Sequence, residues 1–193
     1  MKQTVIFLFI LTIMTMGCND KQTTMKTQDA IENIMNRKSV RKYLDKKVED
    51  EKVTTILKAG MAAPSGKNIR PWELIVVTDR AVLDSMAAKL PNAKMLQQAP
   101  LAIVVCGNTE KSSYWYVDCS AVTQNILLAA EALGLGAVWT ATYPYEDRMQ
   151  VVDSFMELPA EVQSLCVIPI GYPATPSAPK DKWDETKVHY NKW

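Results

Sequence analysis

The sequence predicts a single globular domain in which helices and strands are mixed. Its 193 residues suffice for one domain of ordinary size. Apolar residues make up 48% of the chain and charged residues 22%, proportions typical of globular proteins. These proportions exclude a disordered, collagen-like or disulfide-stapled chain. Helical patterns and short apolar runs then follow one another along the chain, which indicates both kinds of element.

The apolar pattern places these elements in order. Ala30, Ile31, Ile34 and Met35 lie at helical spacing and predict a first helix that begins at residue 27. Further helices are predicted over 49–61, 79–90, 115–133 and 145–155. Buried strands are predicted over 72–78, 101–106, 137–141 and 165–170. The helix at 115–133 is apolar on most sides, so we expect it to be buried in the core or against a partner subunit.

Charge and residue counts exclude several classes of function. The net charge is +1, so the chain has no general attraction to nucleic acid or to acidic membranes. A single histidine, His189, argues against a Ser-His-Asp centre and against a metal site with several histidines. Cys106, Cys119 and Cys166 lie in apolar stretches and are predicted to be buried free thiols. We predict no metal ligand and no side-chain nucleophile.

Residues 1–18 have the features of a targeting segment. Lys2 precedes an apolar run over 5–14, which is shorter than the roughly 20 residues that cross a bilayer and fits the core of a signal peptide. Residues 15–18 resemble a bacterial lipobox in which Cys18 receives a lipid, although Thr15 stands where leucine is usual. We therefore expect a tether at 19–27, a domain at 28–193 and lipid anchoring in the cell envelope. An ordinary cleaved signal, an uncleaved interfacial anchor and, if there is no signal, a cytoplasmic location are the alternatives.

A basic cluster follows the first predicted helix. Arg37, Lys38, Ser39 and Arg41 place two guanidinium groups, an ammonium group and a hydroxyl within five residues. This set can bind a phosphate, because arginine offers a planar fork of donors and serine adds a short one. In an extended segment Arg37, Ser39 and Arg41 project to the same side. The alternative for this cluster is an ordinary solvated surface.

Two more segments contain groups that can bind a ligand. The loop at 63–72 has two prolines, one glycine and several side-chain donors just before a buried strand. Such a loop can present polar groups rigidly to a planar heteroaromatic ligand, and a plain connection between helix and strand is the alternative. Near the C-terminus, Lys180 and Lys182 place cations at alternate positions, which on their own indicate nothing.

Taken together, residues 28–193 resemble the nitroreductase family of FMN-dependent oxidoreductases. The matching segments are RKSVR at 37–41, APSGKNIRPW at 63–72, GLGAVWT at 134–140, and IPIGYP, PKDK and HYNKW within 168–193. The resemblance implies an α+β fold with a central, mostly antiparallel mixed sheet flanked by helices. It also implies an intertwined homodimer, with long helices at the interface and C-terminal segments that embrace the partner.

The resemblance assigns roles in binding FMN. Arg37, Ser39 and Arg41, with Lys38 among them, match ligands of the flavin phosphate and ribityl chain. The other matched residues are Lys180 and Lys182 at the same phosphate, Pro64, Ser65 and Asn68 in a loop from the other subunit, and Trp139 and Thr140, whose backbone approaches the flavin ring. Arg70 replaces the usual glutamine and is expected to favour an anionic reduced flavin. Lys94 is expected near the pyrimidine edge.

The activity implied is a ping-pong reduction. NAD(P)H reduces FMN, and a nitroaromatic compound, a quinone or a similar acceptor is then reduced on the same flavin. The cofactor performs the redox chemistry, so no catalytic side chain is required. An exported protein does not meet cytoplasmic NAD(P)H, however. Either the electron donor is another compound, or the prediction of a signal peptide is wrong. The alternatives are a related flavin enzyme, for reductive dehalogenation or flavin breakdown, and a non-catalytic, lipid-anchored flavin-binding protein.

Overall fold

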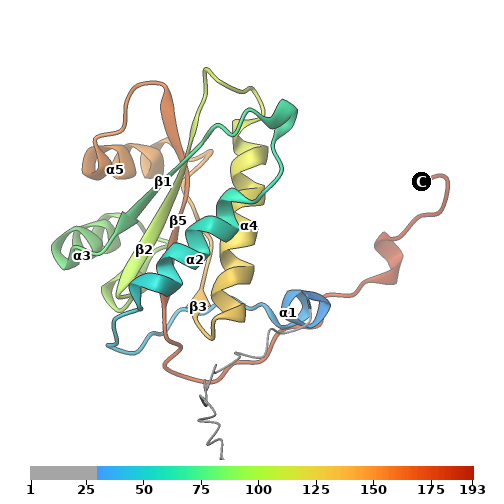
Figure 1. Ribbon diagram of the computed structural model, residues 1–193, viewed down its shortest axis with the longest axis horizontal. Helices are drawn as coiled ribbons and strands as arrows, with labels where there is room; N and C mark the ends of the chain where they lie inside the picture. The colour runs from blue at the N-terminus through green and yellow to red at the C-terminus, as the bar shows by residue number, and fades with distance from the viewer. Residues whose placement is uncertain (1–29) are drawn as a thin grey trace, which may run out of the picture.

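The computed structural model describes residues 30–193 and shows an open sheet between helices (Figure 1). The predicted signal segment, the tether and Cys18 lie outside the described residues. The helices are α1 (Ala30–Asn36), α2 (Asp50–Met61), α3 (Arg80–Lys89), α4 (Trp115–Ala132) and α5 (Glu146–Met156). The strands are β1 (Trp72–Val77), β2 (Leu101–Asn108), β3 (Gly136–Ala137), β4 (Thr140–Ala141) and β5 (Val162–Gly171). Short 3-10 turns span Gly66–Asn68, Lys94–Gln97 and Glu185–Lys187.

The five strands form one sheet in the order β1-β2-β5-β3, and β4 also pairs with β5. Every pair of these strands is antiparallel. The parallel contact within residues 30–193 is an isolated bridge between Ser39 and Ala137. All residues of β2 are buried, as a central strand with helices on both faces requires. The sheet is thus mostly antiparallel, as expected.

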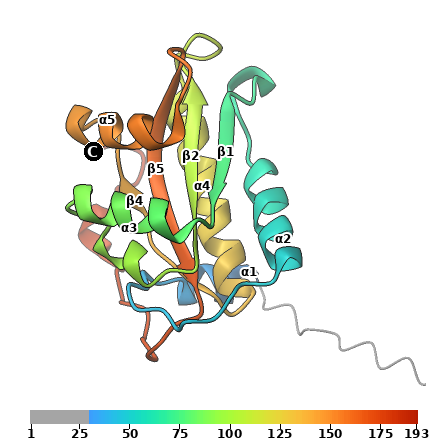
Figure 2. The ribbon, with the colours of Figure 1, turned by 90° about the vertical axis from the view of Figure 1, so that its left-hand side faces the viewer.

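The core has two layers, one on each face of the sheet. Helices α2 and α4 cover one face, and α3 and α5 cover the other (Figures 1 and 2). Neighbouring residues of β2 show the division: Ile103 belongs to the cluster with Val122 and Ile126 of α4, whereas Val104 packs with Leu83 of α3. All five side chains are inaccessible to solvent, and each contributes about 1.5–3 kcal/mol to the free energy of unfolding.

The predicted strand over 137–141 is divided into β3 and β4. Both follow one register against β5, since Ala137 lies opposite Ile170 and Thr140 lies opposite Val167. Pro169 falls within this register and has no N–H to donate, so the ladder is interrupted there. The carbonyl of Pro169 accepts a hydrogen bond from the hydroxyl of Tyr43 instead (3.1 Å).

Helix α1 turns its apolar side outward. Ile34 and Met35 are 49% and 71% exposed, while Asn33 is buried. The side-chain amide of Asn33 donates to the carbonyl of Leu128 in α4 (3.0 Å). The apolar residues whose spacing predicts this helix therefore lie on the surface of this chain and do not contact its core.

Two further predictions concern α4 and the thiols. Helix α4 buries one side against the sheet and α2 but leaves Tyr116 and Val117 exposed, so its burial in a single chain is partial. Cys106, Cys119 and Cys166 are buried free thiols, as predicted. Burial raises the pKa of Cys106 and of Cys166 to about 12, which keeps both thiols protonated and unreactive near neutral pH.

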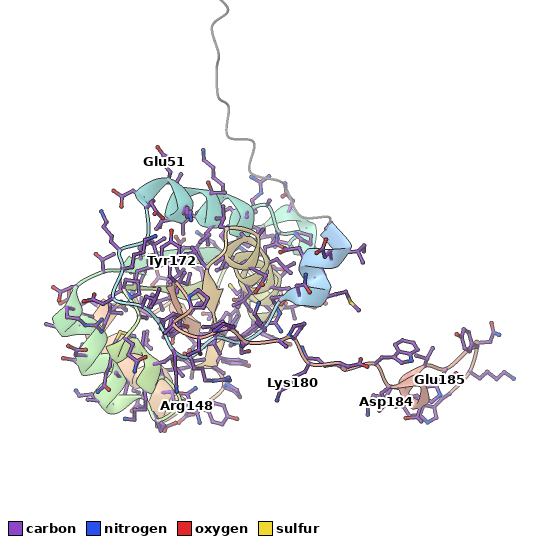
Figure 3. The ribbon with its side chains drawn as sticks, turned by 90° about the horizontal axis from the view of Figure 1, so that it is seen from below. Glu51, Arg148, Tyr172, Lys180, Asp184 and Glu185 are labelled. Carbon is purple, nitrogen blue, oxygen red and sulfur yellow. The ribbon has the colours of Figure 1, made fainter. Side chains whose placement is uncertain are left out.

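The chain beyond β5 extends away from the body as an arm, defined here as residues 172–193 (Figures 1 and 3). Trp183, Tyr190 and Trp193 are 75%, 84% and 100% exposed. Within residues 30–193, none of the helices has the length and apolar character needed to cross a membrane.

Gly136 allows the segment after α1 to approach β3. A Cβ atom at Gly136 would lie 2.6 Å from the Cβ of Val40, whereas one at Gly66 would meet its nearest neighbour, Tyr114, at 3.7 Å. We predict that Gly136→Ala lowers the free energy of unfolding by about 1–3 kcal/mol, because the added methyl group forces Val40 away. Urea denaturation measures this change, with Gly66→Ala as the matched control. Equal stability of the two variants would contradict the prediction.

Candidate functional site

A cavity of about 300 Å³ lies between the segment after α1 and the arm. Its lining residues come from two parts of the chain that are far apart in sequence. The first part contributes Arg37, Lys38, Ser39 and Arg41, and the arm contributes Ser177, Ala178, Lys180 and Lys182. We call this set the cradle. All six predicted phosphate-binding residues of these two clusters therefore line one cavity.

Backbone pairing brings the two parts of the cradle together. Tyr43 forms an antiparallel bridge with Pro173, and on either side Leu44 N–H donates to the carbonyl of Tyr172 (2.9 Å) and Ala174 N–H donates to the carbonyl of Lys42 (3.0 Å). The two segments run antiparallel through this bridge, so the chain before residue 42 and the chain after residue 174 leave it on the same side. Residues of both segments then line the same cavity.

Side chains alternate along the first segment, as expected for an extended chain. Val40 points inward and is buried, and its N–H donates to the carbonyl of Ala137 (3.0 Å). Lys38 also turns inward, where its ammonium group contacts the carboxylate of Glu131 in the last turn of α4 (2.6 Å). Ser39 and Arg41 remain exposed. Glu131 thus neutralises the ammonium group of Lys38 from the side of α4, while Lys38 also lines the cavity together with Arg37, Ser39 and Arg41.

The cradle has an excess of positive charge. Among residues 30–193, the structure gives Arg37, Arg41, Lys180 and Lys182 no salt bridge to an acidic side chain. The carboxylate of Asp181, which lies between the two lysines, accepts the N–H of Trp183 (3.0 Å). Converging cations with forked donors match the charge and shape of a phosphate group.

The loop predicted to approach a planar ligand is fixed in a strained conformation. Lys67, Asn68 and Arg70 have φ angles of 52°, 57° and 54°, in the left-handed region that costs a residue with a side chain about 1–2 kcal/mol. Within the loop, Arg70 N–H donates to Ser65 Oγ (3.0 Å) and Arg70 Nε donates to Asn68 Oδ1 (2.8 Å). Strain of this kind is concentrated at functional sites.

A carboxylate of α4 holds this loop. Gly66 N–H donates to Oδ1 of Asp118 (2.9 Å) in the first turn of α4. Asp118 is buried, and its Oδ2 atom has no hydrogen-bond partner. The positive end of the α4 dipole favours a carboxylate at this position.

The loop and the cradle lie at opposite ends of α4 (Figure 1). Asp118 holds the loop in the first turn of the helix, and Glu131 contacts Lys38 in the last turn. At 1.5 Å per residue these two positions are about 20 Å apart along the axis. Within one chain, Pro64, Ser65, Asn68 and Arg70 therefore do not line the cradle.

The remaining predicted residues lie elsewhere around the sheet. Thr140 is buried, and its hydroxyl donates to the carbonyl of Val167 (2.6 Å). Trp139 is half-buried against the core cluster that includes α4. Both residues follow Ala137, whose bridge to Ser39 places this backbone near the cradle. Lys94 does not line the cavity, because its ammonium group donates to the carbonyls of Ala87 and Ala88 at the end of α3 (2.8 and 3.0 Å).

Sequence reasoning missed Glu131 and the tail residues Ser177 and Ala178. The sequence did contain a signal for Glu131: an acidic residue in the last turn of a helix is unfavourable and indicates a cation nearby. Ser177 and Ala178 are small and ordinary in composition, and only the antiparallel pairing of the arm places them in the cavity.

The fold and the cradle define an α+β protein with a cavity lined by cations at the junction of the body and a C-terminal arm. Residues 34–90 and 83–172 match the family model described as Nitroreductase family. The chain belongs to the nitroreductase family, and the predicted family and fold are thereby confirmed.

Known proteins of this family are similar over most of the chain. A crystal structure of a Bacteroides thetaiotaomicron protein named NADH dehydrogenase/NAD(P)H nitroreductase is 65% identical, with a TM-score of 0.84 over 85% of this chain and 98% of that one. The FMN-dependent nitroreductase of Clostridium difficile is 34% identical, with a TM-score of 0.81 over 84% and 99%. A Methanothermobacter thermautotrophicus protein, also named NADH dehydrogenase/NAD(P)H nitroreductase, is 44% identical over 86% of this chain and 88% of its own length.

Asp118 offers a test of how the loop is held. Asp118→Ala removes the acceptor of the Gly66 N–H, and we predict a loss of about 1–3 kcal/mol in the free energy of unfolding, together with faster hydrogen exchange at Gly66. Asp118→Asn keeps an acceptor oxygen and is the matched control, expected to lose less stability. Unchanged exchange at Gly66 in Asp118→Ala would show that the loop does not depend on this bond.

Proposed function

We propose that the chain is an FMN-dependent oxidoreductase that takes electrons from NAD(P)H and passes them to nitroaromatic compounds, quinones or similar acceptors. The single observation that supports this function best is the convergence of four cations without acidic partners on one small cavity. The names of the relatives point the same way, since one contains FMN and two contain NAD(P)H.

The cradle fits the phosphate of FMN. A phosphate monoester has about −1.5 to −2 charges near pH 7, which the guanidinium groups of Arg37 and Arg41 and the ammonium groups of Lys180 and Lys182 can neutralise. Ser39 adds a hydroxyl donor from the same side of the segment. Lys38 supports the segment from below through its contact with Glu131. The proposed task of these residues is to bind and orient the cofactor.

Bound FMN supplies the redox chemistry, so the protein needs no nucleophile of its own. The three thiols of the body are buried, and burial raises the pKa of each. His189 lies in the arm with its ring 4.2 Å from that of Trp193. We propose a ping-pong order, in which the donor leaves before the acceptor binds beside the same flavin.

We propose that the working unit is a homodimer in which each flavin site uses both chains. The loop at 64–70 cannot reach the cradle of its own chain, because α4 separates them by about 20 Å. The chain also exposes Ile34 and Met35 on α1, Val117 on α4 and three aromatic rings on the arm. A second copy would bury this apolar surface. The loop at 64–70 of that second copy would then lie at the end of α4 where the first chain has its cradle.

We propose that the mature protein is anchored in the bacterial cell envelope through a lipid on Cys18. The support is the sequence at 1–18, with its cationic start, apolar run and lipobox-like end. This location and the NAD(P)H donor exclude each other: in the envelope FMN takes its electrons from a reductant present there, whereas NAD(P)H is the donor if the chain is cytoplasmic.

Arg37 and Arg41 provide the test of the function. We predict that the double variant Arg37→Ala, Arg41→Ala raises the Kd for FMN at least about a hundredfold, because each charge-assisted hydrogen bond contributes about 1.5–3 kcal/mol. Quenching of flavin fluorescence measures the Kd, and oxidation of NADPH with a nitroaromatic acceptor should be lost in parallel. Lys42→Ala, which removes an exposed cation outside the cavity, is the matched control.

Two results would contradict the proposal. Retention of FMN by the double variant at the wild-type Kd would exclude the cradle as the phosphate site. Tight FMN binding by the wild-type protein without reduction by NADH or NADPH would favour the non-catalytic, flavin-binding alternative.

A further inference from the structure

The arm begins at a closely packed point. Gly171 ends β5, and a Cβ atom there would lie 2.6 Å from Cδ of Pro100, so the chain leaves the sheet in close contact with the body. Tyr172 is the first residue of the arm, and Figure 3 shows it against the body while Lys180, Asp184 and Glu185 lie progressively farther out. Of the arm, residues 172–174 pair with the body through Leu44 and Lys42.

The hydroxyl of Tyr172 is held by two side chains of opposite charge. It donates to the carboxylate of Glu49, with its shorter contact to Oε2 (2.6 Å), and it accepts a hydrogen bond from Nζ of Lys52 (2.8 Å). Glu49 immediately precedes α2, and Lys52 lies in its first turn. Hydrogen bonds to charged groups are about twice as strong as neutral ones, so this hydroxyl ties the arm to α2.

The ring of Tyr172 is held as well. The ammonium group of Lys46 lies 3.8 Å from the ring centroid, a distance at which a cation is attracted to the face of an aromatic ring. The hydrogen bond from Tyr172 is the main cause that lowers the pKa of Glu49. The hydrogen bond to Tyr172 is likewise the main cause that raises the pKa of Lys52. Both charged partners are thus stabilised in their ionised forms.

These contacts reach the underside of the cradle. Besides Tyr172, Nζ of Lys52 contacts the carbonyl of Leu133 (3.3 Å) at the end of α4. Leu133 follows Glu131 by two residues, and Glu131 holds Lys38 of the cradle. Beyond residue 174, no backbone hydrogen bond joins the arm to the rest of the described chain. Tyr172 therefore provides the last side-chain anchor of the arm before Lys180 and Lys182.

We propose that Tyr172 is a positioning residue of the phosphate site: held between Glu49 and Lys52, its side chain reinforces the backbone pairing at 172–174 and fixes the start of the arm, so that Lys180 and Lys182 reach the cavity lined by Arg37 and Arg41. This inference rests on the proposed binding of FMN. A tether that starts at a fixed point and direction raises the effective concentration of its far end at the target. Loss of the hydroxyl widens the positions open to both lysines and weakens only the contacts that they make.

The test is Tyr172→Phe in the full chain. The phenyl ring keeps the contact with Lys46 and loses both hydrogen bonds, and we expect the Kd for FMN to rise about tenfold, as for one net hydrogen bond to a charged group. Tyr145→Phe, which alters a 49% exposed tyrosine at the start of α5, is the matched control and should leave the Kd unchanged.

A double-mutant cycle separates positioning from general support of the fold. Tyr172→Phe is also introduced into the double variant Lys180→Ala, Lys182→Ala, which lacks both arm lysines. If Tyr172 acts through the lysines, its effect on the Kd for FMN disappears in this background. A tenfold loss that persists without the lysines would overturn the proposal, as would a wild-type Kd in Tyr172→Phe alone.

A second pair of variants tests the anchor from the side of α2. Glu49→Gln and Lys52→Met each remove one charged partner of the hydroxyl, and both should weaken FMN binding only when the lysines are present. These two variants also test the anchor if Tyr172→Phe does not fold. Failure of the wild-type protein to bind FMN would overturn the proposed function, whereas tight binding by the wild type and all three variants would overturn only the role of Tyr172.

Discussion

The antiparallel pairing of residues 42–44 with residues 172–174 is the constraint on which the candidate site depends. Two backbone hydrogen bonds and one bridge join these segments, although some 130 positions separate them in sequence. The direction of the pairing brings residues 37–41 beside the arm and gathers their cations on one cavity. Neither basic cluster forms a site without this pairing, because each alone is a short run of surface charges.

Such a gathering of like charges stores repulsion that a bound anion relieves. The body limits the repulsion by neutralising Lys38 with Glu131 and leaves the other cations at the surface, where water screens them. The loop at the far end of α4 stores energy in a different form, as three left-handed residues that follow Gly66, the residue bonded to Asp118. Both regions are held by α4, whose two ends fix their separation.

Much of this arrangement could be predicted from local sequence. Strong periodicity located the five helices and the long strands to within a few residues, and alternation placed Arg37, Ser39 and Arg41 on one side of an extended segment, where all three line the cavity. Apart from Glu131, the residues that make contacts between distant parts of the chain had no local signal. Pro169 divides β3 from β4 only because of the register of β5, and Tyr172 meets Glu49 only after the sheet has formed. The spacing of Ile34 and Met35 indicated a helix but not which way it faces.

The most direct test of the cradle compares two ligands that differ only in the phosphate. FMN has a phosphate group and riboflavin lacks it, so the ratio of their Kd values isolates what Arg37, Arg41 and the arm lysines contribute. We predict that FMN binds to the purified wild-type chain at least about a hundredfold more tightly than riboflavin, and that added salt reduces the ratio. Equal Kd values for the two flavins at low salt would contradict the account.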